Sequence, residues 1–325
     1  MDVVRSLAEA RQLVAGGAVA LGNFDGVHLG HRALLTRAAG LAHASGGRAA
    51  ALTFEPHPAK VLAPALAPPL IDTPEKKLEL LAAAGMDVAI VLPFDAALAV
   101  TPPGDFAAAL LDTGVVELVV GFDFSYGRAR AGGVETLRQA ALGRARVHVV
   151  PPVRLDGGEG DGLVVSSTRV REFVLAGRVD AAALLLDRPF SLDGVVVKGV
   201  GRGRQLGYPT ANLATANELM PGLGVYAVRC RLDRRGPAIR GAANIGVNPT
   251  FRPDVAPGES PGRTPVSLEV FLIDFPPDGA SGEIYERTLR VEFIQRLRPE
   301  RRFPGVDALK AQIALDVEAA RAILG

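Results

Sequence analysis

The spacing of apolar segments changes near residue 187, and this change constrains the fold more than any other feature of the sequence. Before that point, short apolar runs alternate with segments of helical periodicity. These runs are Ala18–Gly22, Arg48–Phe54, Asp87–Leu92, Val115–Gly121 and Arg146–Val150. Strands that alternate with helices of about 10–15 residues are typical of βαβ units, so we expect a parallel sheet.

After residue 187, turns rich in glycine and proline separate the apolar runs, without helical segments between them. These runs are Ser191–Val200, Gly224–Leu232, Ala238–Val247, Val266–Phe275 and Thr288–Ile294. One amphipathic helix, Asp307–Leu324, follows the last run. Consecutive strands with one late helix favour a small antiparallel β-barrel. We therefore predict a Rossmann-like α/β domain at residues 1–186 and a β-barrel domain with a C-terminal helix at residues 187–325.

The composition argues against several classes of protein. Cys230 is the single cysteine, which excludes an intrachain disulfide and a zinc site built from cysteines. The 36 basic and 35 acidic side chains nearly cancel, unlike the charge of a bulk nucleic-acid binder. Every apolar run is far shorter than the roughly 20 residues of a membrane span, and the N-terminus lacks a secretory pattern. We expect a cytoplasmic protein that binds neither nucleic acid nor membrane, and its oligomeric state stays open.

The string GNFDGVHLGH, from Gly22 to His31, follows the first expected strand and opens the first long helix. Open α/β sheets bind anionic ligands where the carboxyl end of a strand meets a helix N-terminus. His28 and His31 share one helix face, and Gly30 lets a bulky group approach the backbone. Two imidazoles there could stabilise a triphosphate whose α-phosphorus is attacked. Surface histidines or a fortuitous metal pair are the alternatives for an isolated motif of this kind.

A second phosphate-binding candidate lies at residues 166–171. Ser166, Ser167 and Thr168 are expected at a helix start, where hydroxyls cap free N–H groups and the N–H groups can bind phosphate. Arg169 and Arg171 offer planar guanidinium groups to phosphate oxygens. We favour Arg169 for stabilising a leaving group, although each arginine could instead be a solvated helix residue.

These segments together resemble the HxGH nucleotidyltransferase superfamily. The closer resemblance is to the N-terminal module of the prokaryotic bifunctional riboflavin kinase/FMN adenylyltransferase family, also called FAD synthetases. It is carried by GNFDGVHLGH, by TFEPHP at 53–58, by GFDFSYG at 121–127 and by SSTRVR at 166–171. Tyr126 stands where that family usually has Phe.

The resemblance implies roles for single residues in adenylyl transfer. It makes His28, His31 and Arg169 catalytic. The residues that it assigns to the nucleotide or its phosphates are Gly22, Asn23, Phe24, Asp25, Gly30, Ser166, Ser167, Thr168 and Arg171. It places His57 and Asp123 near the flavin, although by themselves these would be a turn residue and a turn cap.

The second half of the sequence offers hard oxygen ligands and a carboxylate. A glycine-rich loop at 199–203 does not continue as GxGxxG because position 206 is Leu, and no P-loop occurs in the sequence, so we reject a dinucleotide-binding loop. Thr210 and Asn212 follow Pro209 on an expected turn and suit Mg²⁺, unless they only cap that turn. Glu269 alternates with apolar neighbours on a strand. It could accept the proton of an attacking hydroxyl, or it could be a surface glutamate.

This second set resembles the riboflavin kinase module of the same family. It is carried by GRQLGYPTAN at 203–212, GVY at 224–226, NIGVNPTF at 244–251 and LEVFLIDF at 268–275. The resemblance implies that Gly203, Thr210 and Asn212 serve Mg²⁺ and ATP, and that Glu269 is the base. The Arg252–Pro265 loop, long and rich in proline, departs from the family pattern.

One dense basic run, Arg296, Arg298, Arg301 and Arg302, could bind RNA but more often marks a solvated face. The resemblance places part of this segment, with Arg298, beside the flavin. As a whole it covers roughly residues 16–324 and implies two ATP-dependent steps, riboflavin to FMN and FMN to FAD. The alternatives are a single-activity HxGH nucleotidyltransferase with an unrelated barrel, or a non-catalytic sensor of flavins or nucleotides.

Overall fold

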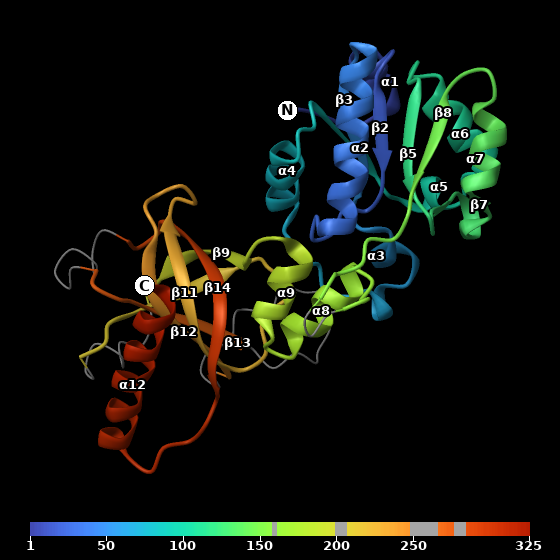
Figure 1. Ribbon diagram of the computed structural model, residues 1–325. Coiled ribbons are helices and arrows are strands. Elements are labelled where there is room, and N and C mark those ends of the chain that lie inside the picture. Colours follow the sequence, from blue (N-terminus) through green and yellow to red (C-terminus); the bar gives the residue numbers. More distant parts are fainter. Residues whose placement is uncertain (158–160, 199–206, 248–265, 276–283) are drawn as a thin grey trace. The chain divides into compact units, whose positions relative to one another are not determined.

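The computed structural model describes residues 1–157, 161–198, 207–247, 266–275 and 284–325 (Figure 1). The chain divides into two units by its internal contacts, Met1–Ser167 and Thr168–Gly325. Among the helices of the described ranges, none has the length and apolar character that a membrane span requires. Gly203 and the Arg252–Pro265 loop lie outside the described residues.

The first unit contains a six-stranded sheet in the order β1-β4-β3-β2-β5-β8, in which every neighbouring pair is parallel. Its strands are β1 (Asp2–Val4), β2 (Ala18–Leu21), β3 (Ala49–Glu55), β4 (Val88–Pro93), β5 (Glu117–Gly121) and β8 (Arg146–Val150). This confirms the predicted parallel α/β sheet. The sequence pattern missed β1 because a strand of three residues is too short to show a period.

Helices cover both faces of this sheet. On one face, Val19, Leu52 and Leu118 pack with α1 (Leu7–Val14), α6 (Pro103–Leu111) and α7 (Val134–Ala141). On the other face, α2 (Leu29–Ser45) and α4 (Pro74–Ala83) pack against small residues of the strands, among them Ala18 and Ala51. Strands buried on both faces form nearly continuous apolar runs, which is why these segments show little alternation.

Shorter elements lie in the connections of the first unit. They are α3 (Pro58–Leu62), η1 (Pro64–Leu66), α5 (Ala96–Ala99), β6 (Ser125–Tyr126), η2 (Arg128–Arg130) and β7 (Gly132–Gly133). The tip of each parallel strand therefore leads into irregular chain or a short helix at the carboxyl edge, where open α/β sheets place their ligands.

The second unit contains a closed six-stranded barrel in the order β10-β13-β12-β11-β14-β9, and its neighbours are antiparallel. Its strands are β9 (Phe190–Val197), β10 (Thr210–Thr215), β11 (Gly224–Leu232), β12 (Ile239–Val247), β13 (Val266–Leu272) and β14 (Thr288–Pro299). The helices of this unit are α8 (Ser167–Leu175), α9 (Val179–Leu186) and α12 (Val306–Leu324), and Ser167 itself belongs to the first unit. This confirms the predicted barrel and its C-terminal helix.

The structure corrects one local prediction in the barrel. Thr210 and Asn212 do not lie on a turn, because they begin strand β10, which pairs with β9 and β13 and closes the barrel. Ala211 and Leu213 point into the barrel core, so Thr210 and Asn212 lie on the opposite face of the strand.

Candidate active sites

The first site is centred on His28, the N-cap of α2. Its Nδ1 accepts a hydrogen bond from the backbone N–H of His31 at 3.3 Å. A neutral imidazole that accepts at Nδ1 carries its proton on Nε2, so Nε2–H is the donor that His28 can offer. The rings of His28 and His31 stack with their centroids 3.7 Å apart. The structure thus brings both predicted histidines together at a helix N-terminus.

The loop before α2 holds an uncommon backbone conformation. Phe24 and Val27 have positive φ angles of 50° and 35°, which is strained for a β-branched residue such as Val27. Gly30 has a more local role than we predicted. A Cβ atom there would lie 3.1 Å from Cε1 of His28, so the absent side chain makes room for the His28 ring. Gly22 likewise accommodates the ring of Phe24, since a Cβ atom would lie 3.2 Å from it.

Asp25 ties this loop to two other segments of the first unit. It is buried, and its Oδ1 accepts the backbone N–H of Ile71 at 2.9 Å, just before α4. The hydroxyl of Ser167 donates to the carbonyl of Asp25 at 2.9 Å, and that of Thr53 to the carbonyl of Asn23 at 2.9 Å. The motif loop is therefore held on both sides by side chains distant in sequence.

Helix α8 begins at Ser167, directly after Ser166, which confirms the predicted helix start. Thr168 and Arg169 are exposed, and Arg169 donates to Oε2 of Glu172 at 2.6 Å. Arg171 is buried, which excludes the alternative that it is a solvated helix residue.

The two residues expected near a flavin lie on loops at the carboxyl edge of the sheet. His57 follows β3 and caps α3, and its Nδ1 accepts the backbone N–H of Ala59 at 3.2 Å. Asp123 follows β5 in an exposed turn that the hydrogen bond from Phe124 N–H to Gly121 O closes at 3.2 Å. Both therefore occupy the positions of turn or cap residues, at the edge of the sheet that carries His28.

Lys77 also reaches this edge, although it belongs to none of the sequence motifs described above. Its buried Nζ donates to the carbonyl of Phe54 at 3.4 Å and lies 3.8 Å from Oε2 of Glu55, both at the end of β3. Burial lowers the pKa of this ammonium, although Glu55, Asp25 and Asp72 act in the opposite direction. Lys77 is far from the histidine motif in the sequence, and only the folding of the sheet brings the two to the same edge. A sequence motif therefore could not indicate it.

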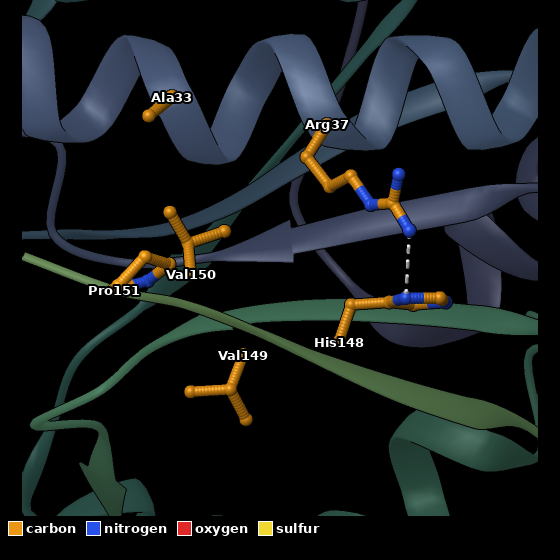
Figure 2. A pocket seen from close by; sticks show the side chains of 6 residues that line it. All are labelled: Ala33, Arg37, His148, Val149, Val150 and Pro151. Carbon is orange, nitrogen blue, oxygen red and sulfur yellow. Dashed lines mark hydrogen bonds between the residues drawn. The ribbon is translucent and has the colours of Figure 1, made fainter.

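A pocket of about 400 Å³ lies between α2 and β8, lined by Ala33, Arg37, His148, Val149, Val150 and Pro151 (Figure 2). Arg37 Nη2 lies 3.3 Å from Nδ1 of His148, and Nε2 of His148 lies 2.6 Å from Oε2 of the buried Glu117. Arg146 also pairs with Glu117. The hydrogen bonds of Arg146 and His148 outweigh burial and lower the pKa of Glu117. This network fixes the edge strand β8.

The second site is a row of polar side chains across three strands of the barrel. Glu269 on β13 pairs directly with Asn212 on β10 and with Asn244 on β12. Residues that are paired across strands point to the same face, so the three side chains are neighbours. All three are partly buried. Thr210, two residues before Asn212, lies on this face too. The sequence identifies Asn244 only as part of a motif, because its proximity to Glu269 follows from strand register.

Most arginines of the basic run form hydrogen bonds within the second unit. Arg298 forms a bidentate pair with the buried Asp316 of α12, at 2.9 Å from Nε to Oδ1 and 2.8 Å from Nη2 to Oδ2. Arg296 donates to the carbonyls of Ala176 and Leu223, and Arg301 donates to Gln312. Arg298 therefore attaches α12 to β14, a structural role that the sequence did not predict.

Comparisons with known proteins decide the family. A model of FAD synthetase matches residues 11–169, and a model of riboflavin kinase matches residues 186–324. The chain is 37% identical to the bifunctional riboflavin kinase/FMN adenylyltransferase of Pseudomonas fluorescens, over 99% of this chain and 98% of that protein. The chain belongs to the bifunctional riboflavin kinase/FMN adenylyltransferase family.

Other members of this family match along most of their length. The Listeria monocytogenes protein is 38% identical over 94% of this chain and 91% of its own. A crystal structure described as a macrolide-efflux protein from Streptococcus pneumoniae has a TM-score of 0.80 and 30% identity, and covers 98% of each chain. The riboflavin kinase match excludes an unrelated barrel. The chain has riboflavin kinase and FMN adenylyltransferase activities, with riboflavin, FMN and ATP as substrates.

Proposed function

We propose that the two activities use two separate sites, FMN adenylylation at the carboxyl edge of the parallel sheet and riboflavin phosphorylation on the Asn212–Glu269–Asn244 face of the barrel. The observation that carries this proposal is the strand register, which pairs Glu269 with an asparagine on each side. The predicted division at residues 1–186 and 187–325 is kept as the functional boundary.

In the proposed adenylyl transfer, a phosphate oxygen of FMN attacks the α-phosphorus of ATP, and pyrophosphate leaves. The attacking phosphate is already anionic, so the step needs positioning and charge stabilisation rather than a base. His28, through Nε2–H, and His31 would stabilise the charge that develops on the α-phosphate oxygens. The backbone from Gly22 to Asp25 and that of Ser166 and Ser167, all in the first unit, would bind phosphates.

In the proposed phosphoryl transfer, Glu269 accepts the proton of the ribityl 5′-hydroxyl while that oxygen attacks the γ-phosphorus of ATP, and ADP leaves. Asn212 and Asn244 flank the carboxylate and would orient it toward the hydroxyl. The hydroxyl of Thr210 and the amide oxygen of Asn212 are hard donors on the same face, and they fit Mg²⁺, which in such sites keeps waters and binds substrate phosphates. When bound, the ion would neutralise charge on the phosphates of ATP.

We propose that His57 and Asp123 contact the flavin at the first site. His57 and Asp123 lie on loops at the edge where FMN would bind. Arg298 is already paired with Asp316, so we propose that it supports the flavin site only by holding α12 in place.

An Asn212→Ala variant of the full chain tests the kinase assignment. Riboflavin or FMN is supplied with ATP and Mg²⁺, and the flavins are separated by chromatography. Because an aligned hydrogen bond to a charged group contributes about 1.5–3 kcal/mol, FMN formation should fall at least about tenfold. FAD formation from FMN is the internal control. Unchanged FMN formation, or an equal loss of both products, would contradict the assignment.

A further inference from the structure

Lys77 lies among three carboxylates at the carboxyl edge of the parallel sheet. Its nearest carboxylate is Glu55 at 3.8 Å, and the charges of Asp25 and Asp72 also act on it. Its side chain is 10% exposed, and Asp25 and Asp72 are buried. Coulomb interactions are strengthened where water is largely excluded, so removing the ammonium would leave three like charges close together.

The same carboxylates are joined to the proposed adenylyltransferase loop. Oδ1 of Asp25 accepts the N–H of Ile71, the residue before Asp72. Lys77 donates to the carbonyl of Phe54, whose neighbour Thr53 donates to the carbonyl of Asn23. Lys77 thus stands where β3, the start of α4 and the loop from Gly22 to Asp25 meet.

The substrates of adenylyl transfer are ATP and FMN, and both carry phosphates of high negative charge. An acidic cluster beside their site would repel them, and its own repulsion would displace Asp25 from its hydrogen bond with Ile71. A buried ammonium that offsets these charges removes both effects.

We propose that Lys77 is a positioning residue for FMN adenylylation. Its ammonium offsets the charge of Asp25, Glu55 and Asp72, so that the loop before α2 can bind polyphosphate. The proposal rests on the location of the adenylyltransferase site given above. Lys77 acts through the carboxylates and the loop, and is not assigned a contact with substrate.

The first test replaces Lys77 with Met in the full chain and measures FAD formation from FMN. Repulsion should raise KM for ATP and for FMN by about tenfold at low ionic strength, with a smaller change in kcat. Added salt should shrink the effect, because the phosphates of the incoming ATP and FMN are solvated and salt screens their repulsion by the cluster. A merely structural defect would not show this salt dependence. Lys77→Arg keeps the charge and should recover most of the affinity.

Lys76 provides a matched control on the same helix. It is also a lysine with a side chain 10% exposed, and it lies 3.9 Å from Glu79 within α4. Lys76→Met should change KM much less than Lys77→Met, and riboflavin kinase activity should be unchanged in both variants. Equal effects of the two substitutions, or an effect of Lys77→Met that salt does not reduce, would overturn the proposal.

A second variant keeps the proposal falsifiable if Lys77→Met does not fold. Glu55→Gln removes one carboxylate and should lower KM for ATP slightly at low salt, and in the Lys77→Met background it should recover a large part of the lost affinity. If Glu55→Gln left KM unchanged or raised it, the electrostatic role would be excluded.

A His28→Ala variant separates failure of this proposal from failure of the proposed site. If His28→Ala kept full adenylyltransferase activity, the location of the site would be wrong. If His28→Ala lost activity while Lys77→Met matched the wild type, the site would stand and the role of Lys77 would be wrong.

Discussion

The two candidate sites are built in opposite ways. In the α/β unit, the centre of the site is a short strained loop, and its residues from Gly22 to His31 are neighbours along the chain. In the barrel, Asn212, Glu269 and Asn244 come from three strands, and only strand register brings them together. The first site therefore depends on local backbone conformation, whereas the second depends on correct pairing throughout a closed sheet.

The two sites also differ in how deeply their central residues are buried and how these residues are held. His28 is only 6% exposed and is fixed by a hydrogen bond to its own helix, whereas Glu269 lies on the outer face of a strand whose alternate residues fill the barrel. A preorganised donor suits charge stabilisation, whereas a carboxylate that accepts a proton must lie within reach of the substrate hydroxyl. Substitutions at the two sites should therefore separate the two activities.

The largest effect is expected at Glu269. Glu269→Gln keeps the shape of the side chain but removes the base, so riboflavin phosphorylation should fall by about 10²–10⁴-fold with little change in KM for ATP. Conversion of FMN to FAD should be unaffected. Full kinase activity in this variant would show that Glu269 is only a surface glutamate of β13.

The next effect is expected at His28. His28→Ala should slow FAD formation from FMN by about 10²–10³-fold, as the loss of one donor to a developing negative charge does. His28→Ser keeps a side-chain acceptor for the helix cap and should lose as much activity while retaining more stability. If His28→Ser were fully active, capping would be the whole role of His28.

A stability measurement tests the assignment of Arg298. Arg298→Met leaves Asp316 buried without its guanidinium partner and should lower the unfolding free energy of the barrel by about 3 kcal/mol in urea. Arg298→Met combined with Asp316→Leu should recover most of that loss. If KM for riboflavin stayed raised in the stable double variant, Arg298 would contact the flavin directly.

A smaller effect is expected at Asn244, which the sequence did not assign to the site. Asn244→Ala should lower kcat/KM of the kinase by about tenfold, because it removes an amide that is paired across strands with Glu269 and that we propose orients the carboxylate. Ser267→Ala, at the next outward position of β13, is the control and should change it less than about twofold. Equal effects at the two positions would contradict a site centred on Glu269.

The smallest effect concerns the open edge of the parallel sheet, which the closed barrel lacks. The pKa of Glu117 is lowered in the folded state, so its contribution to stability is present above the ordinary carboxyl pKa of 4.5 and is lost as pH falls further. Glu117→Gln should lower the unfolding midpoint at pH 7, and the difference from wild type should shrink near pH 3. Calorimetry at both pH values measures this, and a constant difference would contradict it.

The sequence predicted the two architectures and the placement of His28 and His31 at a helix N-terminus, because period and motif are local properties. It did not predict that Thr210 and Asn212 lie on a strand, because Pro209 and the adjacent glycines indicate a turn and barrel closure outweighs that preference. Lys77, Asn244 and the Arg298–Asp316 pair could not be found either, since each acquires its neighbours only through tertiary contacts. The resemblance supplied Glu269, whose place beside two asparagines comes from the register.

Complementation between two damaged full-length chains tests the separation of the sites most directly. Glu269→Gln protein should form FAD only from added FMN, and His28→Ala protein should stop at FMN. An equimolar mixture supplied with riboflavin, ATP and Mg²⁺ should form FAD through released FMN, after a lag that shortens as protein concentration rises. If each variant kept its own activity on its own substrate and the mixture still formed no FAD, the claim of two independent sites would be wrong.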